Sequence, residues 1–220
     1  MNKKGFNFKT DYKLRTKAST ITTFKLKSLR QFSFNSVAYS TLQETFNALR
    51  STKQVSVNGV YYTTLQEAIN SVSTSKETLI TLHSDIKLFN RNIYICQNQN
   101  IVIDLAGYNI SSYNGDGTIY LEGSLTVLDS SSTRSGFIEN TYSNGIGIYF
   151  YHSGALNLYG GTIKASCSLY SWNEYYSPRV IIDGGTIESK CFGVFIRNIE
   201  NLKIRRGIIR GGVSSFDTGD

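Results

Sequence analysis

The feature that most constrains the fold of this chain is a repeat of roughly 24 residues that ends in an apolar run. Five segments align on a final isoleucine, with steps of 28, 25, 24 and 22 residues between Ile110, Ile138, Ile163, Ile187 and Ile209. Further short apolar runs alternate with them at Ile93–Ile95, Thr118–Leu121, Gly147–Tyr151 and Gly193–Ile196. This period, with two or three short strands per repeat, is typical of a solenoid, whose stacked coils bury their aliphatic side chains in one column.

Glycine marks the corners of the repeat. Gly-Gly-Thr-Ile occurs at residues 160–163 and again at 184–187, where Asp183 precedes it. Glycine permits the backbone bend between two sheets. A β-sandwich also contains many short strands, but it does not require the same corner motif in phase. We therefore predict an all-β fold in which residues 77–220 form a parallel β-helix.

A different pattern precedes the repeats. Residues 39–47 (YSTLQETFN) and 62–70 (YTTLQEAIN) match at six positions, and in each a threonine precedes Leu-Gln-Glu. This pattern favours a short, capped amphipathic helix. Between the two copies, residues 54–62 predict a hairpin with Asn58-Gly59 at its turn. We assign residues 36–76 to a capping region with a short helix at the N-terminal end of the column.

The positive charge is confined to the N-terminal quarter. Residues 1–54 contain 11 Lys and Arg against Asp11 and Glu44, a net charge of +9, and the remaining 12 basic and 14 acidic residues give −2. Residues 1–35 also mix Thr, Ser and Phe without a regular period, which predicts an extended basic arm. The cations that would dock this arm to an acidic partner are Lys3, Lys4, Lys9, Lys13, Arg15, Lys17, Lys25, Lys27 and Arg30.

Three stretches of the chain resemble one family. Residues 62–70 (YTTLQEAIN), 78–86 (TLITLHSDI) and 103–110 (IDLAGYNI) look like the entry to a pectate-lyase-like right-handed parallel β-helix. The resemblance covers about residues 55–213 and specifies the fold better than the activity. It implies a right-handed column with a short N-terminal capping helix. Members of this family include polysaccharide lyases and hydrolases, phage tailspikes and bacterial surface adhesins.

The resemblance also directs attention to acidic residues and a basic residue beside them. The weak catalytic candidates are Asp104, Asp129, Asp183, Arg205 and Arg206. Aspartate at a corner most often accepts hydrogen bonds from the backbone of its own turn, and we favour that interpretation. His83 and His152 each stand alone in an apolar pattern, and no catalytic-triad or metal-ligand spacing occurs. We expect no metal, no cofactor and no catalytic site.

Two cysteines are separated by one repeat. Cys167 and Cys191 lie 24 residues apart, the same step as Ile163 to Ile187. We therefore expect them to stack on adjacent coils, near enough for a disulfide. Because the chain shows no secretion signal and Cys96 has no partner, we favour stacked, buried thiols.

An aromatic segment interrupts one coil. Residues 168–178 (SLYSWNEYYSP) contain Tyr170, Trp172, Tyr175 and Tyr176. Exposed aromatic rings can stack on sugars or bury against another subunit. The alternative, that the loop folds its rings onto its own column, stays open.

Export features are missing from the sequence, although the resembled family works mostly outside cells. No run of 18 apolar residues and no signal-peptide core occurs, so we expect no membrane segment. A phage or viral structural protein assembles inside its host and needs no export signal. We therefore predict a non-enzymatic virion component that binds a surface or receptor, docks to other virion proteins through its arm and forms homo-oligomers, trimers being common in such appendages.

Three alternatives stay open. The column could bind or cleave a surface polysaccharide, it could belong to a cell-surface adhesin, or the arm could bind nucleic acid through its phosphates. No amphipathic helix follows the last coil, so we expect another subunit or further chain to cover that end.

Overall fold

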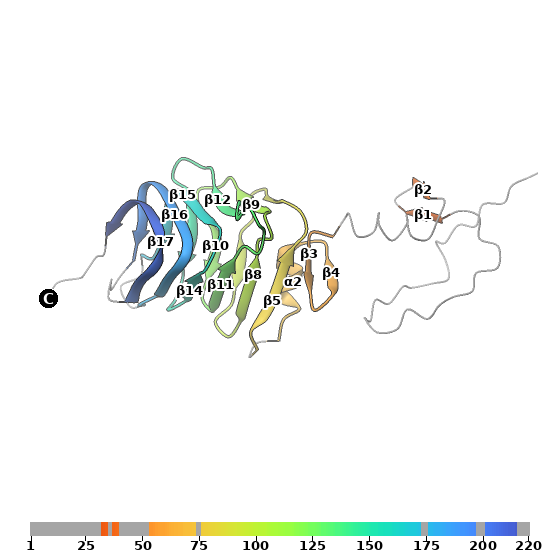
Figure 1. Ribbon diagram of the computed structural model, residues 1–220, viewed down its shortest axis with the longest axis horizontal. Helices are drawn as coiled ribbons and strands as arrows, with labels where there is room; N and C mark the ends of the chain where they lie inside the picture. The colour runs from red at the N-terminus through yellow and green to blue at the C-terminus, as the bar shows by residue number, and fades with distance from the viewer. Residues whose placement is uncertain are drawn as a thin grey trace, which may run out of the picture.

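The computed structural model describes residues 53–73, 76–172, 176–196 and 201–214, together with the backbone of residues 32–34 and 37–39. Its main part is an elongated column of about five turns in which strands of successive coils lie side by side (Figure 1). None of the helical structure in the described part has the length and apolar character of a membrane span.

Three parallel sheets form the walls of the column. The first sheet contains β5 (Thr78–Leu82), β8 (Asn100–Asp104), β11 (Ser124–Leu128), β14 (Ala155–Leu158) and the first parts of β16 (Arg179–Phe195) and β17 (Leu202–Ser214). The second contains β6 (Ile86–Leu88), β9 (Asn109–Ser112), β12 (Phe137–Asn140), the first part of β15 (Thr162–Tyr170) and the middle of β16 and β17. The third contains β7 (Ile93–Ile95), β10 (Gly117–Leu121), β13 (Ile146–Phe150) and the last parts of β15, β16 and β17. Each coil visits the three sheets in this order, so the predicted parallel β-helix is confirmed.

The isoleucines on which the repeats align are direct neighbours in the second sheet. The register pairs Ile110 with Ile138, Ile138 with Ile163, Ile163 with Ile187 and Ile187 with Ile209. Ile86 extends the same column by one coil toward the N-terminus. The sequence alignment therefore identified the true register. From Thr162 onward the strands also continue through the corners, where separate short strands were predicted.

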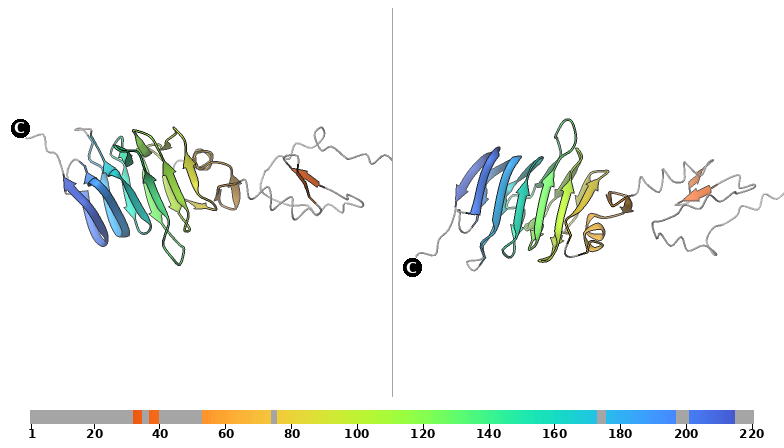
Figure 2. Two further views of the ribbon diagram at one scale, coloured as in Figure 1. Left: turned by 90° about the horizontal axis from the view of Figure 1, so that it is seen from above. Right: turned by 60° about the horizontal axis from the view of Figure 1, so that its bottom comes forward.

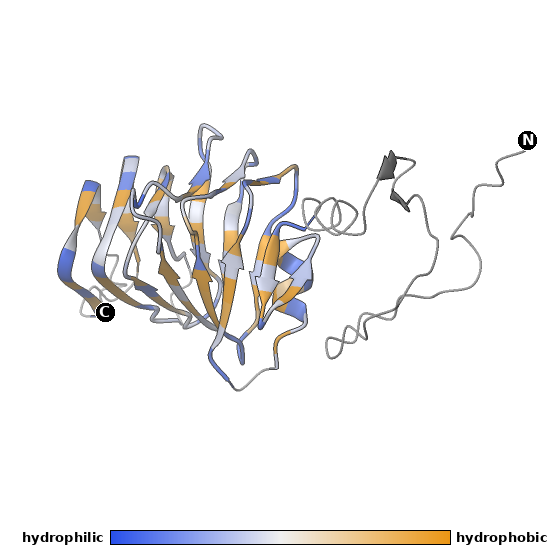
Figure 3. Cartoon of the chain, turned by 45° about the vertical axis from the view of Figure 1, so that its right-hand side comes forward, coloured by the Kyte–Doolittle hydropathy of each residue, from blue (hydrophilic) through white to orange (hydrophobic). Residues whose placement is uncertain are grey.

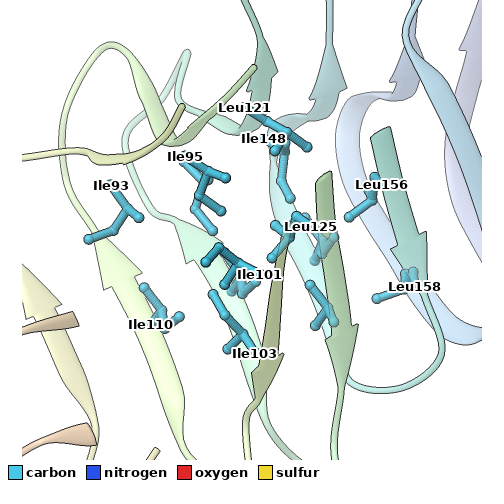
Figure 4. Close-up of a cluster of buried hydrophobic side chains, with 14 of the residues drawn as sticks. Ile93, Ile95, Ile101, Ile103, Ile110, Leu121, Leu125, Ile148, Leu156 and Leu158 are labelled. Carbon is cyan, nitrogen blue, oxygen red and sulfur yellow. The ribbon is translucent and has the colours of Figure 1, made fainter. Parts of the chain in front are cut away.

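The core is a continuous apolar column inside the three sheets. Its side chains are mainly Ile, Leu and Val that alternate with outward residues along each strand, as expected for a period of two. Figure 4 shows Ile93, Ile101, Leu125 and Leu156 pointing into this interior from successive coils. Figure 3 shows the corresponding apolar bands across the strands. Because each coil buries its inward residues only against its neighbours, stacking is required for the core.

A hairpin and a short helix lie at the N-terminal end of the column, opposite β17 (Figure 2). β3 (Val55–Val57) and β4 (Val60–Tyr62) pair antiparallel through a turn at Asn58 and Gly59, whose φ values of 48° and 78° are those of a type I′ turn. β3 then pairs with β5, so the hairpin covers the first strand of the first sheet. The predicted hairpin is confirmed.

Helix α2 (Leu65–Asn70) begins with a capping box. The Thr64 hydroxyl accepts from the Glu67 amide, and the Glu67 carboxylate accepts from the Thr64 amide. The helix buries Leu65, Ala68 and Ile69 against the column. Its Gln66 side chain exchanges two hydrogen bonds with the backbone of Tyr94 in β7, which covers that edge of the third sheet. The second copy of the duplicated segment is therefore the predicted capping helix.

Parts of the predicted N-terminal organisation lie outside the described residues. These parts are residues 40–47 of the first copy of the duplicated segment and the nine arm cations from Lys3 to Arg30. At the end of the predicted arm, β1 (Phe32–Phe34) pairs antiparallel with β2 (Val37–Tyr39).

We predict that Ile163→Ala destabilises the column strongly. Ile163 is fully buried between two coils, and such a truncation costs about 2 to 5 kcal/mol of unfolding free energy. The matched control is Ile208→Ala in β17, because Ile208 is 48% exposed and its loss should cost under about 0.5 kcal/mol. Urea unfolding followed by circular dichroism measures both. Equal losses of unfolding free energy in the two variants would contradict the burial of Ile163 in the core of the column.

Candidate functional site

The acidic candidates Asp104 and Asp129 bind the backbone at the corner between the first and second sheets. One oxygen of Asp104 accepts from the Ala106 amide of its own turn at 3.0 Å and from the Ser130 amide of the next coil at 2.9 Å. Asp129 accepts from the amides of Gly107, in the preceding coil, and Gly136, at 2.9 and 2.7 Å. Both carboxylates are buried and join neighbouring coils, as the interpretation as turn caps predicts.

The electrostatics of Asp129 fit this structural role. Burial would raise the pKa of its carboxyl, but hydrogen bonds from Ser131, Gly136 and Gly107 outweigh burial and hold the pKa below its usual value. The carboxylate is thus stabilised in its charged form by fixed amides. A general acid or base needs a proton that it can exchange near the working pH, which this environment opposes.

Asp183, Arg205 and Arg206 do lie together, as an ion-pair cluster across the last two described coils. Arg206 Nε donates to Asp183 Oδ1 at 2.6 Å, and Arg205 Nη1 lies 3.8 Å from Oδ2. The hydrogen bond and charge of Arg206 lower the pKa of Asp183. Asp183 lies two coils beyond Asp129, with Tyr159 and Gly160 at the corner between them, so the three acids do not converge. Within the described ranges, no group of three potential metal ligands occurs.

The two histidines have different surroundings. His83 Nε2 lies 2.8 Å from the Ser56 hydroxyl, at the N-terminal end of the column. His152 Nδ1 lies 3.3 Å from Glu122 Oε1, and its ring contacts those of Tyr151 and Tyr176 at 5.0 and 4.6 Å between centroids. His152 is therefore part of an aromatic surface rather than a residue standing alone.

The expected stacking of the two cysteines is wrong. A bulge places one extra residue in β16, so Cys167 pairs with Phe192 instead of Cys191. Cys191 is exposed, Cys167 is half-buried, and both are free thiols, as is the exposed Cys96. Burial, with a smaller contribution from Cys191, raises the pKa of Cys167 to about 12, so its thiol is not a ready nucleophile.

The outward face of the third sheet carries a ladder of aromatic rings. Tyr94, Tyr120, Tyr149, Tyr170 and Phe195 occupy the same outward position in five successive coils. Neighbouring ring centroids are 5.1 to 5.6 Å apart along this ladder. The spacing follows from the distance between adjacent parallel strands. Such cross-strand aromatic pairs also stabilise the stacking of the coils.

The ladder is interrupted at one place. Tyr94 stacks on Tyr120 at 19° and Tyr149 stacks on Tyr170 at 22°, but Tyr120 and Tyr149 meet at 80°. The Tyr151 ring lies near both sides of this interruption, 6.4 Å from Tyr120 and 6.2 Å from Tyr149. The surface is therefore not a uniform stack, and ring edges and faces are both presented here.

An open groove of about 490 Å³ lies at this interruption. We call it the aromatic groove; its lining residues are Asp116, Tyr120, Ile146, Tyr149, Tyr151, Tyr170 and Trp172. Desolvation, together with the charge and a hydrogen bond of Asp116, raises the pKa of Tyr120 to about 12. Burial likewise raises the pKa of Tyr149 and Tyr170, so these phenols keep their protons at neutral pH and can donate hydrogen bonds.

The predicted aromatic segment belongs only partly to this groove. Tyr170 is not in an insertion, because it lies in β15 and forms a rung of the ladder. Trp172 is 66% exposed at the rim and lies parallel to Tyr170 at 6.4 Å. Tyr176 contacts His152, and Tyr175 lies outside the described residues.

The sequence prediction missed Tyr94, Tyr120, Tyr149 and Tyr151. The signal was present, because the runs Ile-Tyr-Ile, Ile-Tyr-Leu and Ile-Tyr-Phe place tyrosine between two inward residues in three successive coils. Reading the outward position of each aligned run would have found the ladder.

Comparisons with protein-family models, with curated proteins and with solved structures find no match to this chain.

We predict that Asp129→Asn destabilises the fold. An asparagine can accept only with its single oxygen, so the amide of Ser131 or Gly136 would face a donor, and a buried unsatisfied group costs about 1 to 3 kcal/mol. Because the folded-state pKa of Asp129 is lowered, its contribution is present above the unfolded pKa and is lost as pH falls through the folded pKa.

The measurement is unfolding free energy against pH, with Asp183→Asn as the control. Asp183 is held by exposed arginines, so its substitution should cost less at neutral pH than that of Asp129. If the unfolding free energy falls at acid pH in the same way in wild type and in Asp129→Asn, the role of Asp129 as a stabilising turn cap is contradicted.

Proposed function

We propose that this chain is a carbohydrate-binding β-helix that holds an extended glycan in the aromatic groove without cleaving it. The observation that supports this most directly is that five aromatic side chains line one groove. Two of them, Tyr151 and Trp172, are exposed, and the others are the ladder residues Tyr120, Tyr149 and Tyr170. The volume of about 490 Å³ falls in the range of small-molecule sites, although the groove is open rather than enclosed.

Sugars suit this chemistry because they have an apolar ring face and a hydroxylated rim. Aromatic rings cover the apolar face, while phenol and carboxylate groups bond the hydroxyls. The phenol groups of Tyr149, Tyr151 and Tyr170 take part in no hydrogen bond among the described residues, so they can serve a ligand. Aromatic rings are also present in successive coils, with 5.1 to 5.6 Å between neighbouring centroids, which favours a ligand of several sugars over a single sugar.

Binding is favoured over cleavage by the distribution of acids. Most glycosidases place two carboxyl groups on either side of the scissile bond, separated by about 5 to 9.5 Å. Asp116 is the single carboxylate that lines the aromatic groove in the described part, and it bonds Tyr120. Asp104, Asp129 and Asp183 belong to a different corner and are occupied by amides or arginines. A lyase-type role for these acids therefore has no support in the site geometry.

The proposed setting is the surface of a phage or viral particle. The basic arm would dock to acidic virion proteins, and the column, as a single copy or within a homo-oligomer, would present the aromatic face outward. This setting is supported by the net charge of +9 on residues 1–54 against −2 on the rest of the chain. It is also supported by the resemblance to the pectate-lyase-like family, of which tailspikes are members.

We predict that Tyr151→Ala and Trp172→Ala each weaken glycan binding by about tenfold, or about 1.4 kcal/mol, because each removes a ring at the groove. The matched control is Tyr159→Ala, since Tyr159 is 46% exposed and Tyr151 is 51% exposed, but Tyr159 lies at the corner between the first and second sheets. Affinity electrophoresis through gels containing xylan, glucomannan, β-glucan, polygalacturonate or alginate measures retardation. Wild-type protein that migrates freely in every gel would overturn the proposal.

We also predict that replacing the nine arm cations by glutamine abolishes co-sedimentation of the protein with the phage or viral particles of the proposed setting. The midpoint of thermal unfolding of the column should stay the same. The reason is that residues 1–54 carry a net charge of +9, whereas the rest of the chain carries −2. Deleting residues 1–52 is the complementary variant. Unchanged co-sedimentation of both variants would exclude arm-mediated docking, and strongly salt-dependent binding to free DNA would favour the nucleic-acid alternative.

A further inference from the structure

We infer that a second, polar groove beside the aromatic groove binds the continuation of the same glycan, and that this glycan is uncharged. The inference rests on the proposed function and names the ligand class and the extent of its site.

The polar groove has a volume of about 390 Å³ and lies where the chain passes from the third sheet to the first. Three successive coils contribute to it, through the corners that follow β7, β10 and β13. Its lining residues are Gln97, Asn98, Gln99, Asn100, Glu122, Gly123, Ser124, His152, Ser153 and Ala155. Amide, hydroxyl and carboxylate groups of this kind are donors and acceptors that match the hydroxyls of a sugar.

The two grooves are adjacent around the column. Tyr151 lines the aromatic groove and the next residue, His152, lines the polar groove. Their rings contact each other at 5.0 Å, and His152 also contacts Tyr176 at 4.6 Å. A ligand that leaves the aromatic groove past Tyr151 therefore meets His152 and Glu122 next. The path runs around the column at its third corner and is longer than either groove alone.

Not all of the polar lining is available to a ligand. The Gln99 side chain is buried and bonds the Cys96 amide and the Ile69 carbonyl, so it supports the fold. In contrast, Gln97 and Asn98 are exposed at the turn between β7 and β8, and their side-chain amides form no hydrogen bond within the described residues. These two amides are the groups that a sugar would engage.

The charge of the lining determines the ligand class. Asp116 lines the aromatic groove and Glu122 the polar groove, and no lysine or arginine of the described residues lines either groove. A glycan with carboxylate or sulfate groups would meet like charge without a compensating cation, which disfavours it. The cation nearest in register is Arg179, paired with Ala155 in the first sheet, and it belongs to the lining of neither groove. A neutral glycan can instead donate its hydroxyls to the oxygens of both carboxylates.

The experiment is isothermal titration of the full chain with neutral cello-, xylo- and manno-oligosaccharides of increasing length and with oligogalacturonates of matched length. We expect affinity for the best neutral series to rise with length until both grooves are filled, and to exceed that for the matched oligogalacturonate by at least about tenfold. The double variant Gln97→Ala/Asn98→Ala should weaken binding of the longest oligosaccharide by about tenfold and leave the shortest bound oligosaccharide unaffected.

Two further variants separate the parts of the inference. Asp116→Asn/Glu122→Gln should raise the affinity for oligogalacturonate, because it removes the like charge. Tyr159→Ala should change nothing, as it lies outside both grooves.

The outcomes are distinguishable. Tighter binding of oligogalacturonate than of every neutral series, by the full chain with its nine arm cations replaced by glutamine, would overturn the uncharged ligand while glycan binding stands. A Gln97→Ala/Asn98→Ala variant that binds long neutral oligosaccharides as tightly as wild type would overturn the second groove. If no oligosaccharide of either class binds, the proposed function itself is wrong.

Discussion

The in-register pairing of each coil with the next is the constraint on which the rest of this structure depends. Because every strand pairs with its equivalent in the following coil, any property of one position repeats at the strand spacing along the column. Inward positions become the aliphatic core, as in the series from Ile110 to Ile209. Corner positions become shared caps, since Asp104 and Asp129 each bond amides of a neighbouring coil. The fold is thus stabilised by contacts between coils more than by contacts within one.

The same register explains which parts of the molecule the sequence could predict. The inward isoleucines are the most uniform signal, and aligning them gave the correct pairing without any structural information. The Tyr94 to Phe195 ladder follows from that alignment and was missed because only the inward residues of each run were compared. The predicted stacking of Cys167 on Cys191 was wrong for a different reason. One additional residue between Ser189 and Phe192 shifts the register locally. A constant sequence step cannot reveal such a bulge, since the isoleucines on its N-terminal side remain aligned.

The candidate groove required three-dimensional information that no single motif carries. Its lining combines strands β10, β13 and β15 with three residues outside them: Asp116 before β10, Tyr151 after β13 and Trp172 after β15. The 80° angle between Tyr120 and Tyr149 depends on how rings pack in adjacent coils, which the residue types alone do not determine. Trp172, in contrast, was identified from sequence, because it belongs to the dense run of aromatic residues in the segment 168–178.

The outward faces differ in a way that separates structural from binding roles. On the second sheet, Glu139, Lys164, Glu188 and Arg210 occupy one outward position in four successive coils, and Lys164 lies 3.1 Å from Glu139. The alternating signs place each charge beside an opposite charge, so this face is already satisfied by its own neighbours. On the third sheet, neighbouring rings of the ladder lie nearly parallel along most of its length. This stacking is interrupted between Tyr120 and Tyr149, whose rings meet at 80°. There the phenols of Tyr149 and Tyr151 keep hydrogen-bonding capacity that no described neighbour uses. A ligand gains most where a repeated surface leaves such capacity unfilled, and for this reason the aromatic groove, rather than the corner acids or the charged ladder, is the surface on which function is to be sought.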